Sequence, residues 1–294
     1  MGQSVLSLQL TMKEAKAVKD ILLENGWMDR GSSDERVVLR MQSFTGSICT
    51  LYFTRKIVFQ GNEDFSNIAS LVKKSKPVSF KPHLGVDEVG KGDYFGPLVV
   101  ASCFVTDDFF KTVSSLGVVD SKKLSDGRIR DIYKSIKDYP YYYVSVVKPI
   151  EYNELIKEYE NVAILLAKQH SKVIEMALED LQSKSIKCNS VVIDQFSSKE
   201  SRVVDELGEL GRSANFKQFH KGESDVAVAC ASVYARAVFL EEMDRMSDEY
   251  YFLFPKGSFE VVESAKRFVK LHGRGELEKV AKISFKTTSK VLSF

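Results

Sequence analysis

The pattern of hydrophobic and polar positions predicts a compact α+β unit in the first quarter of the chain. Residues 12–25 carry apolar side chains at the spacing of an amphipathic helix, and Gly26 follows as a helix terminator. Short, mostly apolar runs at residues 37–41 and 47–53 indicate strands. A strand from about Ser4 and a second helix that ends near Lys74 complete the unit.

A charged stretch at residues 73–77 separates this unit from the rest of the chain. It ends in Pro77, which cannot continue a helix. We therefore predict an N-terminal domain over residues 1–76, a linker over 77–82 and a second, larger domain over 83–294. Up to Phe80 the chain has eleven Lys or Arg against eight Asp or Glu. This mild excess suits docking to nucleic acid, but an ordinary solvated surface explains it equally well.

The pattern of the remaining chain predicts a mixed sheet flanked by helices, an α/β fold. Runs of aromatic and β-branched residues come first and suggest an antiparallel meander; they lie at 84–88, 98–105 and 141–147. Helical segments then alternate with strands. The helical segments are expected at 151–182, 199–210 and 224–246, and the strands at 190–194 and near Phe216.

Composition excludes several classes of protein. The 294 residues are 44% hydrophobic, enough for a large core, and no apolar run approaches 18 residues, so we expect a cytoplasmic protein without membrane contact. The formal net charge of +2 leaves nucleic-acid binding to local patches. The cysteines contain no C-x-x-C pair, which favours buried thiols over disulfides or a zinc site; they are Cys49, Cys103, Cys188 and Cys230.

Carboxylates at the ends of apolar strands are the candidate functional groups. Asp87 and Glu88 end one such strand, and Asp194 ends another. Neighbours in a strand point to opposite faces, so Asp87 and Glu88 could share a ligand only where the strand breaks into the glycine-rich turn. Hard divalent cations bind carboxylate oxygens. For any one of these residues alone, a turn cap is the simpler interpretation.

Three motifs in order resemble those of type 2 ribonucleases H. They are GVDEVGKGDYFGPLVVAS at residues 85–102, DSKKL at 120–124, and ASVYAR at 231–236, which follows Lys221-Gly222-Glu223. The resemblance runs from Leu84 to the C-terminus. GKG in place of GRG, together with the N-terminal extension, points to the HIII branch. This resemblance implies a ribonuclease H-like sheet, preceded by a small domain similar to the TATA-binding protein that grips the substrate.

The resemblance also implies a set of functional residues. The catalytic and metal-binding carboxylates would be Asp87, Glu88, Asp194 and Glu223. Asp225 is an alternative to Glu223, although a carboxylate that starts a helix is the favoured interpretation of Asp225. Contacts to the substrate would come from Gly90, Lys91, Gly92, Lys122 and Ser232.

The implied reaction is hydrolysis of the RNA strand of RNA/DNA hybrids by two Mg²⁺ or Mn²⁺ ions, leaving 5′-phosphate and 3′-hydroxyl ends. The backbone of the GKG turn would contact the 2′-hydroxyl that distinguishes RNA from DNA. The resemblance gives no obligate protein partner, and we expect a monomer.

Other functions remain open at this point. An HII-type enzyme would cut at single ribonucleotides in duplex DNA. Gly85, Gly90 and Lys91 nearly satisfy a nucleotide-binding P-loop, but Gly92 stands where its Ser or Thr should be. A non-catalytic hybrid-binding protein is a further possibility. The histidines are expected to be ordinary surface or packing residues, and His220 alone would merit a test; they are His83, His170, His220 and His272.

Overall fold

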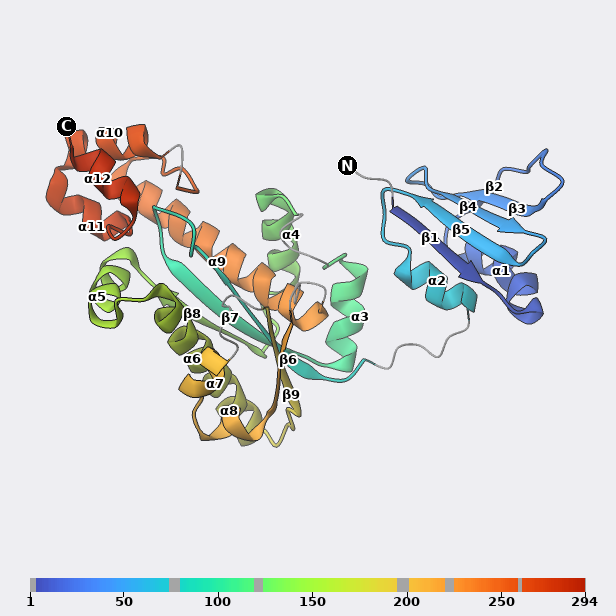
Figure 1. The fold of residues 1–294 in the computed structure, drawn as a ribbon, viewed down its shortest axis with the longest axis horizontal. Helices are drawn as coiled ribbons and strands as arrows, with labels where there is room; N and C mark the ends of the chain where they lie inside the picture. Colours follow the sequence, from blue (N-terminus) through green and yellow to red (C-terminus); the bar gives the residue numbers. More distant parts are fainter. Residues whose placement is uncertain are drawn as a thin grey trace. The chain divides into compact units, whose positions relative to one another are not determined.

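The computed structural model describes residues 4–73, 80–118, 124–194, 201–219, 225–258 and 261–293. Its contacts divide the chain into two compact units, Met1–Phe80 and Lys81–Phe294, which are taken in turn (Figure 1). Part of the predicted linker falls outside the described residues.

The first unit is an antiparallel sheet with the strand order β1-β5-β4-β3-β2. Its strands are β1 (Ser4–Gln9), β2 (Met28–Asp29), β3 (Val37–Gln42), β4 (Ile48–Tyr52) and β5 (Lys56–Gly61), and its helices are α1 (Met12–Glu24) and α2 (Ser66–Lys73). Helix α1 begins with a capping box, in which the Thr11 and Glu14 side chains each accept the other residue's backbone N–H. The predicted helices and strands are present, with β2 and β5 in addition.

Both helices of the first unit pack on one face of its sheet (Figure 1). Val18 and Leu22 of α1 and Val72 of α2 are buried in a core that also contains Phe59 of β5. Side chains alternate between the faces of a strand, so the residues between the buried ones line the opposite face. Within the described residues no helix covers that opposite face.

The second unit contains the predicted mixed sheet, in the order β10-β9-β6-β7-β8. Its strands are β6 (His83–Val89), β7 (Leu98–Val105), β8 (Tyr142–Val147), β9 (Ser190–Asp194) and β10 (Asn215–Phe219). Strands β6, β7 and β8 form the expected antiparallel meander. Strand β9 pairs in parallel with β6, and β10 with β9. The carboxyl ends of β6, β9 and β10 therefore lie at one edge of the sheet.

Helices cover both faces of this sheet (Figure 1). The long helix α6 packs on one face and α9 on the other. The helices are α3 (Asp107–Ser115), α4 (Asp126–Ile136), α5 (Pro149–Tyr159), α6 (Val162–Ser183), α7 (Ser201–Glu206), α8 (Glu209–Ser213), α9 (Val226–Tyr250), α10 (Val262–His272), α11 (Leu277–Val280) and α12 (Lys286–Leu292).

One helix prediction needs correction, and several helices were missed. The single helix expected over residues 199–210 is wrong, because Leu207 and Gly208 interrupt it between α7 and α8. A Cβ on Gly208 would lie 2.8 Å from the Glu175 carboxyl carbon, so the end of the Glu175 side chain on α6 packs against this interruption. Helices α3, α4, α10, α11 and α12 were not predicted.

A glycine lets α9 lie directly on the central strand. A Cβ on Gly85 of β6 would fall 2.0 Å from the backbone carbon of Ala227 and 2.2 Å from the nitrogen of Val228. Only a residue without a Cβ permits this approach of strand and helix. The first turns of α9 contribute small buried side chains, such as Ala229 and Ala231, to the same contact.

The structure tests two expectations from composition, one about the cysteines and one about helices that could span a membrane. All four cysteines are free thiols; three are buried, and Cys188 is half-buried, which corrects the expectation that all would be buried. In the parts of the chain that the structure describes, every helix is too short or too polar to span a lipid bilayer.

Candidate functional site

The two adjacent carboxylates at the end of β6 point to opposite faces of the sheet. Leu84 and Val86 belong to the core that α6 covers, whereas Gly85 faces α9. By alternation, Asp87 lies on the α9 face and Glu88 on the α6 face. Asp87 is 5% exposed, and its Oδ1 accepts the backbone N–H of Glu88 at 2.8 Å. This bond fixes the Asp87 carboxylate at the point where the strand enters the turn.

The register of β9 places Asp194 beside Asp87. Val86 pairs with Ile193, and Asp87 and Asp194 are the next residues of the two parallel strands. Residues in register on neighbouring strands face the same side, at a strand spacing of about 4.8 Å. Asp87 and Asp194 therefore share the α9 face at the carboxyl ends of their strands, with Glu88 next to them on the other face.

His170 lies behind Glu88, which the sequence analysis did not anticipate. Its side chain is fully buried on α6, and its Nε2 lies 3.1 Å from Glu88 Oε2. His170 is therefore a packing residue, as the sequence allowed, but one that also contacts a predicted catalytic carboxylate. A signal was available, because His170 falls on the buried stripe that includes Ala167, Val173 and Ile174, where a polar side chain needs a partner.

The donor set of this site fits a hard divalent cation. Asp87, Glu88 and Asp194 offer only carboxylate oxygens, which Mg²⁺ and Mn²⁺ prefer. Among the described residues, no group of three or more His, Cys, Asp or Glu is arranged to hold a metal ion. The predicted fourth carboxylate, Glu223, lies outside the described residues.

Asp225 caps the start of α9, and its carboxylate is engaged in hydrogen bonds there. Its carboxylate accepts the N–H groups of Ala227 and Val228 at 2.9 and 3.2 Å, and lies 2.9 Å from Nε2 of His83. Burial is the largest influence and acts to raise the pKa of Asp225, but the hydrogen bond and charge of His83 and the N–H groups of Val228 and Ala227 together outweigh it, so the pKa lies below its usual value. His83 is four residues before Asp87, at the other end of β6. The interpretation of Asp225 as a helix-start carboxylate is confirmed.

The glycine-rich turn after β6 is held by its own geometry. Gly90 has φ +89°, and a Cβ there would lie 2.1 Å from the carbonyl oxygen of Pro97. Gly92 is exposed, and a Cβ on it would meet nothing within 4 Å. Gly90 is therefore required by the turn itself, whereas packing in the described residues gives no reason for Gly92. Lys91 between them is half-buried.

A distant segment anchors the second half of this turn. Asp93 Oδ1 accepts the backbone N–H of Gly257 at 2.6 Å, and the Tyr94 N–H donates to the Gly257 carbonyl at 2.8 Å. The neighbouring Lys256 forms an ion pair with Asp126 at the start of α4, and Asp126 also accepts from Arg236 of α9 at 2.7 Å. These contacts connect the turn, α4 and α9. Sequence spacing alone gave no sign of them.

The remaining predicted residues are placed as follows. Ser232 lies on α9 and is 9% exposed. Lys122 lies outside the described residues. The P-loop alternative is wrong, because Gly85 lies within strand β6 and the turn leads into strand β7, whereas a P-loop leads from a strand into a helix.

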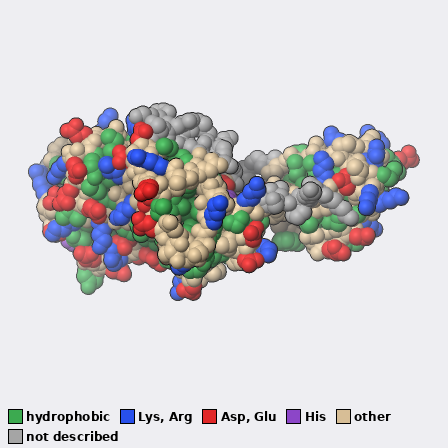
Figure 2. Space-filling model, turned by 90° about the horizontal axis from the view of Figure 1, so that it is seen from below, with side chains coloured by type: hydrophobic (Ala, Val, Ile, Leu, Met, Phe, Trp, Pro, Cys, Tyr) green, Lys and Arg blue, Asp and Glu red, His purple; other side chains and the backbone are tan. Residues whose placement is uncertain are grey.

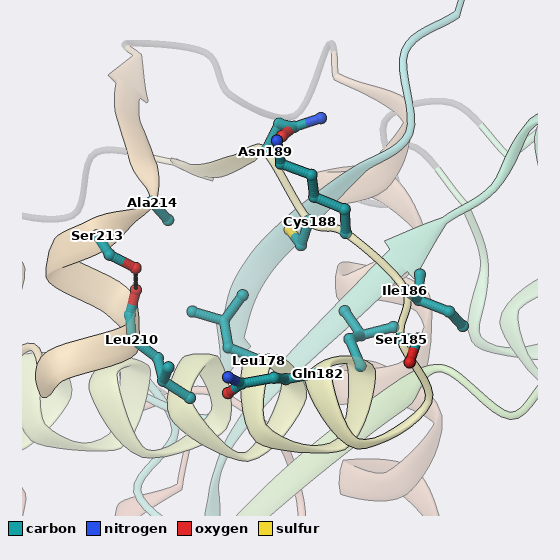
Figure 3. Close-up of a pocket in the computed structure, with 11 residues that line it drawn as sticks. Leu178, Gln182, Ser185, Ile186, Cys188, Asn189, Leu210, Ser213 and Ala214 are labelled. Carbon is teal, nitrogen blue, oxygen red and sulfur yellow. Dashed lines mark hydrogen bonds between the residues drawn. The ribbon is translucent and has the colours of Figure 1, made fainter.

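A pocket of about 550 Å³ lies at the opposite end of the sheet (Figure 3). It is lined by Leu178 on α6, by Leu210 on α8 and by Cys188, which precedes β9. The amino ends of β9 and β10 adjoin this pocket, whereas Asp194 is at the carboxyl end of β9. The pocket is therefore separate from the carboxylates.

Comparisons with known proteins agree with the motifs. The family model for ribonuclease HII matches residues 84–288. A ribonuclease HIII of Protochlamydia amoebophila is 36% identical over 259 residues, 84% of each chain. One of Chlamydia pneumoniae is 30% identical over 295 residues, 97% of each chain. The crystal structure of Bst-RNase HIII in complex with Mn²⁺ has a TM-score of 0.68 at 27% identity, covering 99% of this chain and 98% of that one.

These matches extend through both units and include the glycine-rich turn and the strand ends that carry the acidic residues. They confirm the predicted fold class of the second unit and the resemblance on which the functional expectations depend. The chain belongs to the ribonuclease HIII family, within the type 2 ribonucleases H.

Proposed function

We propose that Asp87, Glu88 and Asp194 are catalytic carboxylates with which this ribonuclease H cuts the RNA strand of RNA/DNA hybrids, leaving 5′-phosphate and 3′-hydroxyl ends. The observation that carries the proposal is the register of β6 and β9, which puts Asp87 and Asp194 side by side. Glu223 is proposed as the fourth carboxylate. Asp225 is not, because its oxygens cap α9 and contact His83.

Two of the proposed catalytic carboxylates are held in place at the end of β6. Asp87 is held by the N–H of Glu88, and His170 holds Glu88, so both acids are oriented before substrate arrives. Carboxylates this close repel one another, which favours the binding of cations. Two divalent ions, when bound, would supply an activated water and stabilise the departing oxygen of the phosphodiester.

The exposed part of the glycine-rich turn is proposed to contact the RNA strand. Gly92 is exposed and has no packing reason to lack a side chain, which fits a backbone that a ligand must approach closely. A 2′-hydroxyl can both donate to and accept from such a backbone. Lys91, and with it Lys122 and Ser232, are proposed as further contacts to the substrate.

The open face of the first sheet is proposed to bind the hybrid outside the cleavage site. Its exposed residues include the polar or basic Gln9, Arg40, Lys56 and Gln60, with the apolar Val5 beside them. Acidic and basic side chains are mixed across the face of the molecule seen in Figure 2, so attraction to phosphates must come from such local groups. The combined change Arg40→Gln and Lys56→Gln should raise KM and reduce the salt dependence of binding. Lys13→Gln on the exposed side of α1 is the matched control.

Cleavage of a long RNA/DNA hybrid, compared with a DNA duplex that contains one ribonucleotide, tests the activity. Metal-dependent cutting of the hybrid alone is expected, with Mg²⁺ or Mn²⁺ and not with chelator. Cutting at the single ribonucleotide would instead indicate HII-type specificity. Cutting of neither substrate would refute the nuclease assignment.

Carboxamide variants test the individual residues. Asp87→Asn and Glu223→Gln should abolish cleavage and retain hybrid binding, whereas Asp225→Asn should cut normally and be less stable. Loss of cleavage in Asp225→Asn, with full activity in Glu223→Gln, would reverse the assignment of the fourth carboxylate. A non-catalytic hybrid-binding protein would bind equally in all three variants and cut in none.

We further propose that the enzyme acts in the cytoplasm as a monomer. Light scattering of the purified protein should give the 33.2 kDa of one chain.

A further inference from the structure

Lys282 is a fully buried lysine whose ammonium group reaches the glycine-rich turn. Its Nζ donates to the carbonyl oxygens of Asp93 at 2.9 Å and Gly96 at 2.6 Å. It also lies 5.6 Å from the centre of the Tyr152 ring. None of these groups belongs to the proposed catalytic carboxylates, so Lys282 has a role that the reaction does not yet explain.

The backbone around Lys282 holds the same turn. Its N–H donates to the Tyr94 carbonyl at 2.8 Å, and Gly96 N–H donates to the Val280 carbonyl at 3.0 Å. Residues 280–282 therefore run alongside residues 94–96. The Lys282 side chain adds hydrogen bonds to the carbonyl oxygens of Asp93 and Gly96. An apolar side chain could fill the space without the cost of burying an ammonium group. What an apolar side chain could not supply is the donor that the carbonyl oxygens of Asp93 and Gly96 share.

The contact continues to the residues proposed to meet RNA. Lys282 binds the Asp93 carbonyl, and the Asp93 N–H donates to the Gly90 carbonyl at 3.2 Å. Gly90 directly precedes Lys91 and Gly92. Hydrogen bonds thus connect the exposed part of the turn, through Asp93, to a residue 189 positions further along the chain.

We propose that Lys282 is a positioning residue that holds the glycine-rich turn in the form that contacts the 2′-hydroxyl of the RNA strand. This inference rests on the proposed function of the turn. Lys282 would support the turn through its ammonium group without touching either the substrate or the catalytic carboxylates.

The hydrogen bonds of Lys282 to the turn are expected to depend on pH. Burial lowers the pKa of Lys282 to about 7, although the nearby Asp93 carboxylate opposes the shift. Asp93 and the Tyr152 ring are the described groups with titratable side chains that face the ammonium. As the pH rises through 7 the ammonium loses its charge, and its hydrogen bonds to the two carbonyls become weaker.

Lys282→Met tests the proposal, with Lys279→Met as the matched control. Lys279 is exposed on α11 and pairs with Glu276. At pH 6.5 the Lys282 variant should show a KM for hybrid about tenfold higher, the effect of one lost charge-assisted hydrogen bond, with a smaller change in kcat. The difference from the wild type should shrink by pH 8.5. A folded Lys282→Met with wild-type KM across this range would overturn the proposal.

A second measurement needs no variant. Fluorescence anisotropy of the wild type in Ca²⁺ gives its affinity for a hybrid and for a DNA duplex of the same sequence. The preference for the hybrid should fall several-fold between pH 6 and 8.5, and a constant preference would contradict the proposal. If the wild type cuts no hybrid at all, the proposed function fails. If it cuts hybrid and prefers it equally at every pH, only the role of Lys282 fails.

Discussion

Gly85→Ala is expected to disable the enzyme although it adds a single methyl group. The new Cβ would lie 2.0 Å from the carbonyl carbon of Ala227, 2.2 Å from the nitrogen of Val228 and 2.4 Å from the oxygen of Ala227. Carbon atoms in contact are separated by about 3.5 Å or more, so strand and helix must move apart by roughly 1.5 Å. All three contacts are backbone atoms in the first turn of α9, and a change of rotamer cannot relieve them.

The size of the effect follows from this displacement. Overpacking a core costs about 1–3 kcal/mol, and a backbone clash between the central strand and a 25-residue helix belongs at the upper end. We expect a loss of about 3 kcal/mol in the free energy of unfolding. Gly85 is two residues before Asp87, and a misplacement of about 1 Å in an active site can lower the rate about a hundredfold. We therefore expect kcat to fall by about that factor.

Urea denaturation can separate the two units in the assay. The only tryptophan, Trp27, lies in the core of the first unit, so its fluorescence reports the unfolding of that unit. Far-UV circular dichroism reports both units. Gly85→Ala should lower the urea midpoint of the second unit, which only circular dichroism detects. The midpoint of the fluorescence transition, which reports the first unit, should not change. Gly127→Ala is the control, because a Cβ there meets nothing within 4 Å and alanine favours the helix α4.

Two outcomes would refute this reasoning. Wild-type stability and activity in Gly85→Ala would mean that α9 does not approach β6 as closely as the structure has it. A shift of the Trp27 fluorescence transition would mean that the damage is not confined to the second unit.

Three further predictions concern side chains around the site. His170→Phe removes the contact to Glu88 and keeps the ring packing, so kcat should fall about tenfold with KM for hybrid unchanged; an unaltered kcat would dismiss a positioning role. Asp225→Ala removes the N-cap of α9 and the partner of His83, and should cost about 1–2 kcal/mol at pH 7 by urea denaturation. Because the pKa of Asp225 is lowered, that difference should vanish as the pH falls below it. Lys282 releases its proton in the folded chain near pH 7 but keeps it in the unfolded chain to about 10.5. The wild type should therefore gain about 1.4 kcal/mol per pH unit relative to Lys282→Met between pH 7.5 and 9, and equal pH slopes would contradict the burial of this lysine.

The sequence by itself determined the elements whose signal is local. Apolar runs that end in Asp87, Glu88 and Asp194 predicted strands with carboxylates at their ends, because side-chain alternation depends only on neighbours along the chain. The same reasoning predicted the meander β6-β7-β8, the mixed sheet and the helix start at Asp225. It missed α4, although Ile129, Ile132 and Ile136 have helical spacing and Ser125 caps the first turn.

The tertiary structure decided which distant residues meet. Asp87 comes to lie beside Asp194 only because β9 pairs in parallel with β6, and no local sequence pattern predicts this pairing. His170 reaches Glu88 across 82 positions, and Lys282 reaches Asp93 across 189. Both side chains are buried polar groups, whose partners are set by how α6 packs on the sheet and how the chain after α11 packs on the glycine-rich turn. A sequence pattern can show that such a residue needs a partner, but only the packing of the helices on the sheet determines which one it has.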